Sequence, residues 1–434
     1  MTRRMPRQTA WMPVLVGGLF VAAGLIGNPW TLASVLSPDG ELAGRTRLLI
    51  LGGDGALALA GMVLIVFRRR LMQGASRGIF ARHPNVAAMI LGIGASAALV
   101  AAVEGTFFVL NRYSGRPADI FRQGHAGDYA NLVRTLSPGM RAYDDLLGHR
   151  PRANSVFTER LTKGDAVIYD VSYTIDAHRC RVVPQEFDAP PDKFIAFAGC
   201  SFAFGTGVAD DESLPARVAA RTRGHRVYNL ANPGDGPHQT LAILGEWDLR
   251  FIQEARGELV YVFIPQHISR AAGTMLQTAT YGRNDPAFRL EGDSVVYLGS
   301  FASAFPARTF FYDLLYHEQA LHWLGRDWPP ASTKEHIRYS ARLLSDASRR
   351  FGEMFEDGRF HVLLHPLNEP SGVDMKLVRS IFESEGLHVL DYQSMFDGAN
   401  EGMFFPVDQH PTPAAHDRVA ERLAGDLALA TAIK

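Results

Sequence analysis

The chain has 434 residues, of which 47% are hydrophobic, and a formal net charge of -1. This length allows a large core and more than one module. The nearly balanced charge gives no reason to expect nucleic acid as a partner. The two cysteines, Cys180 and Cys200, exclude a disulfide scaffold and a multi-cysteine metal site. They could form one disulfide, but we favour two unpaired buried residues.

Three apolar runs occupy the first quarter of the chain, and each is about as long as a bilayer requires. They cover residues 11–32, 48–67 and 87–110. The first run follows basic residues and could be a cleaved signal peptide. We reject that interpretation because no convincing small-residue cleavage site follows and two further runs do. The pattern predicts three transmembrane helices, with residues 1–112 as a membrane anchor.

The arginines predict how these helices are oriented. The loop over residues 33–47 holds only Arg45 and Arg47, offset by two acidic residues. The positive-inside rule then places the amino terminus and the second loop in the cytoplasm, and everything after about residue 111 outside. In a bacterium this means an inner-membrane protein with a periplasmic domain. The cytoplasmic arginines are Arg3, Arg4 and Arg7 before the first run, and Arg68, Arg69, Arg70, Arg77 and Arg82 between the second and third.

Residues 113–192 are mixed in composition and predict a connecting segment with a small β element. Helical spacing around Tyr129, Leu132, Val133 and Leu136 favours a helix leading away from the membrane. Near-alternating apolar residues predict a strand over 166–173. The prolines of residues 188–192 then end regular structure before the next module.

Residues 193–434 alternate strands with helices, which predicts a parallel sheet covered on both faces. The central run, residues 194–198, is apolar and ends at Gly199, as is typical of a buried parallel strand. Residues 270–332 are irregular and aromatic, which favours an inserted lid or cap. Further strands are expected at 226–230, 258–264, 361–364 and 388–392, and helices at 214–221, 237–251, 333–355, 375–385 and 416–430.

Polar residues follow the ends of these strands, where open α/β sheets bind ligands. Acyl transfer needs a nucleophile, a base, an acid that orients the base, and oxyanion donors. We assign Ser201 as nucleophile, His410 as base and Asp408 as its orienting acid. The backbone N–H groups of Ser201 and Gly234 would face the oxyanion. A third donor could come from the side chain of Gln266 or His267.

Each assignment has a simpler alternative. Ser201 could cap the helix that follows, His410 could be structural, and Gly234 could serve its turn alone. Gln266 and His267 are more readily explained as structural residues. Cys200 is a rival nucleophile, although its side chain should point back into the strand layer. We expect no metal site, because the histidines lack the paired spacing of a helical zinc site, and no cofactor.

Three segments resemble, in order and spacing, the conserved blocks of the SGNH/GDSL hydrolase family. They are GCSFAFGTGV at 199–208, VYNLANPGDGPHQ at 227–239 and DQHPTPAAHDRVAERLA at 408–424. The resemblance runs from about residue 195 to the carboxyl terminus and implies a flavodoxin-like three-layer fold. It also implies Ser201 as nucleophile, Gly234 as oxyanion donor, and Asp408 with His410 in the last block. Membrane-attached bacterial members near polysaccharide genes are more similar than soluble lipases.

Three positions depart from the family pattern. Cys200 stands where an aspartate usually precedes the serine, and Gln266 or His267 stands in place of the third-block asparagine. One residue, instead of two, separates Asp408 from His410. The related alginate O-acetylation proteins share that spacing, which favours a transferase.

The sequence therefore predicts a membrane-anchored periplasmic serine esterase that deacylates a glycan or a cell-envelope ester. A polysaccharide O-acetyltransferase of the same fold, and a non-catalytic glycan-binding scaffold, remain as alternatives. The expected partners are an acylated glycan, the inner membrane and polysaccharide-assembly proteins.

Overall fold

The structure, a computed structural model, describes residues 132–427 apart from 223, 293, 317–326, 328–332, 368–371 and 399, together with 17–18, 21–22, 62, 65–66 and 103–108. The chain divides into one unit of residues 1–120 and 317–326 and another of residues 121–316 and 327–434. The three predicted spans lie largely outside the described residues. Within the described part of the chain, no helix has the length and apolar character needed to cross a bilayer.

The second unit is built on a five-stranded sheet in the order β12-β11-β8-β6-β7. Every neighbouring pair in it is parallel, as predicted. Numbered by chain position the order is 2-1-3-4-5, the flavodoxin-like doubly wound arrangement, whose order reverses between its first and third strands. The strands are β6 (Lys193–Gly199), β7 (His225–Asn229), β8 (Arg256–Phe263), β11 (Glu356–Leu364) and β12 (His388–Asp391).

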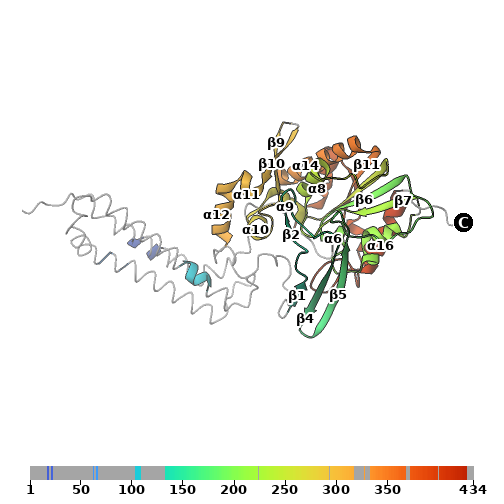
Figure 1. Cartoon of the computed structure of the whole chain (residues 1–434). Helices are drawn as coiled ribbons and strands as arrows, with labels where there is room; N and C mark the ends of the chain where they lie inside the picture. Colours follow the sequence, from blue (N-terminus) through green and yellow to red (C-terminus); the bar gives the residue numbers. More distant parts are fainter. Residues whose placement is uncertain are drawn as a thin grey trace, which may run out of the picture. The chain divides into compact units, whose positions relative to one another are not determined.

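Helices cover both faces of this sheet (Figure 1). Successive residues of β6 enter opposite cores: Ile195 and Phe197 join one cluster, whereas Phe194 and Ala196 join the other. The first face is covered by α7 (Leu214–Ala219) and α16 (Pro413–Asp426), and the second by α8 (Pro237–Glu246), α14 (Lys334–Met354) and α15 (Met375–Ser384). The helices predicted after the central strand are confirmed within the described residues, although α8 ends at Glu246, earlier than expected.

A second, three-stranded antiparallel sheet has the order β1-β4-β5. It consists of β1 (Leu132–Leu136), β4 (Ser155–Lys163) and β5 (Ala166–Ile175), with the hairpin β2 (Ala142–Asp144) and β3 (Gly148–Arg150) beside it. In Figure 1, β4 and β5 extend as a long green pair away from the main sheet. The helix predicted around Leu132 and Leu136 is wrong: five consecutive residues pair with β4, and this pairing overrides the helical spacing.

The segment over residues 270–332, predicted to be irregular, consists largely of helices and a β-hairpin where the structure describes it. Its hairpin of β9 (Pro286–Glu291) and β10 (Ser294–Ser300) packs on α14, since the Tyr339 hydroxyl donates to the Phe288 carbonyl at 2.9 Å. Phe301 and Tyr312 are buried, so core packing explains part of its aromatic content. The elements here are α9 (Gln266–Ala272), α10 (Met275–Thr280), β9 (Pro286–Glu291), β10 (Ser294–Ser300), α11 (Phe301–Ala304) and α12 (Pro306–Tyr316).

Candidate active site

Ser201 lies just past the carboxyl end of β6, where the order of the sheet reverses. It begins the short helix α6 (Ser201–Phe204). The preceding Gly199 has φ +126°, and a Cβ there would lie 2.7 Å from the Val262 carbonyl oxygen. Only glycine fits this turn, which places Ser201 at the edge of the sheet with 9% of its surface exposed.

The structure brings Ser201, His410 and Asp408 into one hydrogen-bonded chain. The Ser201 Oγ lies 2.9 Å from His410 Nε2, although 209 positions separate the two residues. On the other side of the ring, His410 Nδ1 lies 2.7 Å from Asp408 Oδ2. This is the geometry in which a serine can lose its proton to an imidazole that a carboxylate orients.

A strained turn explains how one intervening residue is enough for the Asp408–His410 contact. Val407 and Gln409 both have φ +62°, in the left-handed region that most residues avoid. The Phe405 N–H donates to the His410 carbonyl at 2.9 Å and closes the turn. The backbone thereby folds back on itself, so that both side chains meet despite the short spacing.

The Asp408 carboxylate is kept ionised. Burial opposes its charge, but the charge and hydrogen bond of His410 outweigh burial, and Arg134 adds to them, so the pKa of Asp408 is lowered. Asp408 can therefore stabilise a protonated His410 without taking up the proton itself.

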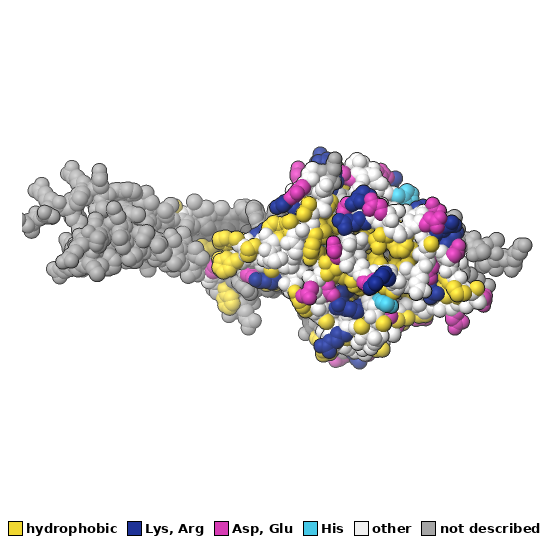
Figure 2. Space-filling model, turned by 45° about the horizontal axis from the view of Figure 1, so that its top comes forward, with side chains coloured by type: hydrophobic (Ala, Val, Ile, Leu, Met, Phe, Trp, Pro, Cys, Tyr) yellow, Lys and Arg dark blue, Asp and Glu magenta, His cyan; other side chains and the backbone are white. Residues whose placement is uncertain are grey.

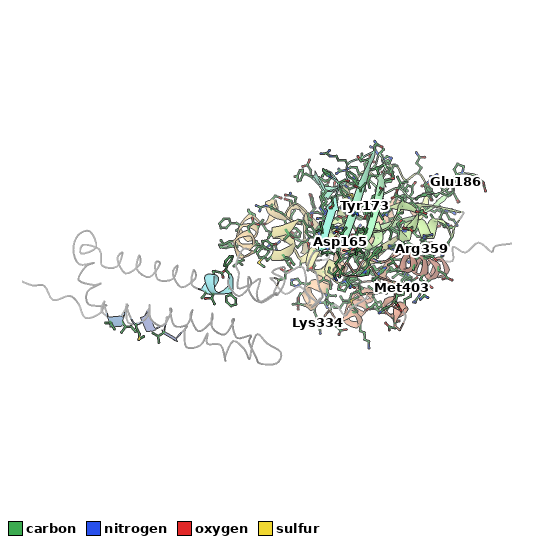
Figure 3. The ribbon with its side chains drawn as sticks, turned by 90° about the horizontal axis from the view of Figure 1, so that it is seen from below. Asp165, Tyr173, Glu186, Lys334, Arg359 and Met403 are labelled. Carbon is green, nitrogen blue, oxygen red and sulfur yellow. The ribbon has the colours of Figure 1, made fainter. Side chains whose placement is uncertain are left out.

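The small antiparallel sheet supports the site through a buried carboxylate that the sequence did not reveal. Glu159 pairs with Arg134 and accepts hydrogen bonds from the hydroxyls of Tyr173, at 2.6 Å, and Tyr169, at 3.2 Å. Tyr173, labelled on its strand in Figure 3, also accepts from the Gly207 N–H at 2.9 Å. The sheet predicted as part of a connecting segment thus holds the glycine loop that follows the nucleophile.

Arg181 is a second support for this loop, and its side chain is fully buried. Its guanidinium donates to the carbonyls of Phe204, Gly205 and Val208 at 2.8, 2.5 and 2.7 Å. Its Nε also lies 2.9 Å from the carboxylate of Asp210. The clamp satisfies carbonyls that α6, with only four residues, leaves unpaired.

The segment that leads to Gly234 runs alongside the end of β6, because strand pairing continues past the end of β7. The Leu230 N–H donates to Phe197 and the Asn232 N–H donates to Gly199, at 2.8 and 3.2 Å. Gly234 follows two residues later with φ +101°. Among the described residues, the N–H groups of Ser201 and Gly234 donate to no protein acceptor. Both are therefore available to a negatively charged oxygen next to the serine.

Gln266 and His267 make no hydrogen bond to Ser201 among the residues that the structure describes. Gln266 begins α9 with an exposed side chain. His267 is fully buried and its Nδ1 lies 2.6 Å from the Tyr261 hydroxyl. Burial, followed by the charge of Arg270, keeps the pKa of His267 well below its usual value. No hydrogen bond joins either side chain to Ser201 within the described part, so their role as donors stays a prediction.

Arg270 from α9 was missed by the sequence reasoning. Its Nη1 donates at 2.9 Å to the carbonyl of Asp235, the residue that follows Gly234.

Both cysteines are buried and unpaired, which confirms the preferred interpretation and excludes the disulfide. In the described ranges, no three His, Cys, Asp or Glu side chains are grouped so that they could hold a metal ion.

A cavity of about 280 Å³ opens next to this constellation. Its lining includes Pro233, which directly precedes Gly234, and Arg134, whose charge contributes to the lowered pKa of Asp408. Arg141 forms no ion pair within the described residues, and its guanidinium lies 5.3 Å from the centre of the Tyr281 ring. The lining consists of Arg134, Leu136, Met140, Arg141, Glu159 and Pro233.

No protein-family model matches the sequence, and no curated protein matches it. Among solved structures, the chain is similar to LAE5, an alpha/beta hydrolase enzyme from the metagenome of Lake Arreo in Spain, with 15% identity, a TM-score of 0.33, and 55% of this chain and 96% of that one covered. A member of the lipolytic protein G-D-S-L family from Veillonella parvula has 13% identity, a TM-score of 0.32 and coverage of 54% and 97%. Axe2, an acetylxylan esterase from Geobacillus stearothermophilus, has 14% identity, a TM-score of 0.31 and coverage of 54% and 93%. Because these identities and TM-scores are low, the geometry of the site is what indicates the chemistry of this chain.

Proposed function

We propose that this chain is a serine esterase of the SGNH/GDSL type, which transfers an acyl group from its substrate to Ser201 and then to water. The observation that carries the proposal is the continuous contact from Ser201 Oγ to His410 Nε2, at 2.9 Å, and from His410 Nδ1 to Asp408, at 2.7 Å. A non-catalytic scaffold has no need of this alignment, nor of two unpaired amides beside the serine.

The reaction follows from these contacts. His410 takes the hydroxyl proton as Ser201 Oγ attacks the ester carbonyl, and the resulting oxyanion accepts from the N–H groups of Ser201 and Gly234. The protonated His410 then gives its proton to the leaving alkoxide, and an acyl-Ser201 ester remains. Water then attacks this ester as His410 takes its proton, and His410 returns that proton to the Ser201 oxygen as the acid is released. Each preorganised oxyanion donor contributes about 3 kcal/mol to the transition state.

The cavity beside the site favours a small acyl group on a polar substrate. Its lining combines Leu136 and Met140 with two guanidinium groups and a carboxylate. A long lipid chain would need a larger and more apolar cleft. Charged side chains of both signs are interspersed over the visible face of the described domain (Figure 2). We therefore propose an acylated glycan, or another polar ester of the cell envelope, as the substrate.

A glycan hydroxyl could replace water in the second step, which would make the protein an O-acyltransferase. The observation that favours this alternative is the tight Asp408–Gln409–His410 turn, with Gln409 at φ +62°. This turn accommodates the one-residue spacing between Asp408 and His410, which resembles the spacing in the alginate O-acetylation proteins. Purified protein supplied with an acetyl donor and a glycan should release acetate if it is an esterase. Acetylated sugar, detected by mass spectrometry, would instead identify the transferase.

We also propose that the chain is anchored in a bacterial inner membrane with its catalytic unit in the periplasm. The support is the three apolar runs and the placement of the arginines around them. Reporter fusions after residue 111 should be active only with a periplasmic reporter. A fusion that reports a cytoplasmic location would contradict this part of the proposal.

Ser201→Ala in the full-length protein is the direct test of the catalytic proposal. Wild type should hydrolyse p-nitrophenyl acetate. The variant should lose at least about 10³-fold in kcat, because the oxyanion donors that remain cannot take the place of the attacking hydroxyl. Ser303→Ala, at an exposed serine on α11, is the matched control and should retain wild-type activity. Equal rates for wild type and Ser201→Ala would reject catalysis at this serine.

A further inference from the structure

A second histidine–carboxylate pair lies against the turn that carries Gly234. His149 comes from β3 and has 6% of its surface exposed. Its Nε2 lies 3.0 Å from the carbonyl oxygen of Pro233, although 84 positions separate the two residues. Its Nδ1 lies 3.7 Å from Oδ1 of Asp285, a fully buried carboxylate. The reaction described above uses neither side chain.

The Pro233 carbonyl and the Gly234 N–H belong to one peptide group. A peptide is planar and normally trans, so its C=O and N–H point in opposite directions within one plane. A hydrogen bond that fixes the Pro233 oxygen therefore also fixes the direction of the Gly234 N–H. Within the described residues that N–H has no protein acceptor of its own to hold it in place.

Glycine makes this anchoring necessary. Gly234 has φ +101° and no Cβ, so rotation of the 233–234 peptide meets little steric resistance from the residue itself. The space around it is nevertheless filled: an added Cβ would lie 3.2 Å from Tyr281 and 3.3 Å from His149 Nε2. The turn thus depends on its neighbours for its orientation, and His149 is the neighbour that contacts the carbonyl.

Asp285 makes His149 a suitable donor. Burial opposes charge on the ring, but the Asp285 carboxylate outweighs it and raises the pKa of His149, which favours a proton on each ring nitrogen. Asp285 itself is positioned by Gln277 Nε2 at 3.1 Å and faces His238 Nε2 at 3.5 Å. The carboxylate is therefore anchored on α10 and α8 as well as beside β3.

We propose that His149 is a positioning residue: backed by Asp285, it holds the Pro233 carbonyl and so keeps the Gly234 amide aimed at the oxyanion. The inference rests on the proposed acyl-transfer function and adds a residue set to it. Because the pair acts on the orientation of one donor, its loss should slow the chemical step more than it weakens substrate binding.

The test compares His149→Phe with His361→Phe in full-length protein. His361 is a matched reference, because it is also 6% exposed and pairs with a buried carboxylate. It lies on β11, and its Nε2 is 3.0 Å from the carboxylate of Glu258 on β8. His149→Phe should lower kcat for p-nitrophenyl acetate about 10- to 100-fold with KM nearly unchanged, as for a misplaced donor. His361→Phe should keep the wild-type kcat.

Two further measurements separate positioning from folding. Phenylboronic acid forms a tetrahedral adduct with an active-site serine, so its affinity should fall in parallel with kcat. His149→Gln retains an N–H donor and should recover part of the lost kcat. If His149→Phe does not fold, His149→Gln and Asp285→Asn decide: wild-type kcat and boronate affinity in both would overturn the inference.

The outcomes are distinct from those of the parent proposal. A wild-type chain without Ser201-dependent hydrolysis would overturn the proposed function and this inference with it. An active wild type together with a folded, fully active His149→Phe would overturn the inference alone. A loss of kcat in His361→Phe as large as in His149→Phe would also overturn it, because the effect would then reflect general destabilisation.

Discussion

One histidine–aspartate pair contacts Ser201 and another contacts the turn that carries Gly234, and the two differ in what the second ring nitrogen of the histidine faces. In the His410–Asp408 pair that nitrogen faces the Ser201 hydroxyl, and the two side chains are 14% and 13% exposed. In the His149–Asp285 pair it faces the Pro233 carbonyl, and the side chains are 8% and 0% exposed. The first pair thus faces a hydroxyl, which can lose a proton, whereas the second faces a carbonyl, which has no proton to lose.

This difference separates proton transfer from positioning. A hydroxyl oxygen can give its proton to an imidazole, and solvent access allows the reacting groups to enter and leave. A peptide carbonyl can only accept, so the buried pair is limited to holding the backbone. The distances agree with these two roles: the aspartate lies 2.7 Å from its histidine in the first pair and 3.7 Å in the second. The first pair has hydrogen-bond geometry and the second has only ion-pair geometry.

The largest effect is expected from the first pair. Asp408→Asn keeps the shape of the side chain but favours the wrong tautomer of His410, and should lower kcat about 10⁴-fold, the loss seen when a triad aspartate is replaced in this way. The measurement is the steady-state rate with p-nitrophenyl acetate. Asp357→Asn is the control, because Asp357 is 81% exposed at its side chain. An Asp408→Asn protein within tenfold of wild type would show that His410 does not depend on Asp408.

The next effect is expected at the group that the second pair holds. Gly234→Ala should lower kcat about 10²-fold or more, because the new Cβ is strained at φ +101° and displaces the oxyanion donor. Gly386→Ala is the matched control, since it carries similar strain at φ +81° with no atom within 4 Å of the new Cβ. Equal kcat values in the two variants would argue that the Gly234 turn has no catalytic role.

The sequence predicted the main sheet and the first pair because their signals are local. The apolar run of β6, the glycine that ends it and the polar residues past the strand ends are all readable within a few positions. The supports of the site have no such signal. Tyr173 acts on Gly207, 34 positions away, and His149 acts on Pro233, 84 positions away. Their roles exist only after the small sheet has folded against the main one.

The incorrect helix around Leu132 has the same physical origin. Its spacing is compatible with a helix when the segment is considered alone, but Leu132 to Leu136 pair in register with Lys163 to Glu159. Partners from another part of the chain decided the outcome. The segment that looked like a connector therefore supplies Arg134 and Glu159 to the site, and no local pattern distinguishes these from surface charges.

The smallest effect is expected in the stability of the folded protein. In the folded protein, burial lowers and Asp285 more strongly raises the pKa of His149, with Asp235 adding to the rise. A histidine whose pKa lies above its unfolded value near 6.5 contributes stability that is complete below that value and is lost as the pH rises through the folded pKa. The difference in unfolding free energy between wild type and His149→Gln should therefore be larger at pH 5 than at pH 9.

Asp285 does not change its charge between pH 5 and pH 9 in the wild-type protein. Its burial opposes charge, but His149 and His238 lower its pKa to about 2, so it stays ionised throughout the range measured. His238 and Asp235 also face this site and remain in both proteins. Urea titrations at the two pH values measure the effect, with His361→Gln as the reference. A difference that is constant between pH 5 and pH 9, or that grows with pH, would mean that the His149–Asp285 contact gains nothing from the charge on the ring, and that His149 positions Pro233 as a neutral donor.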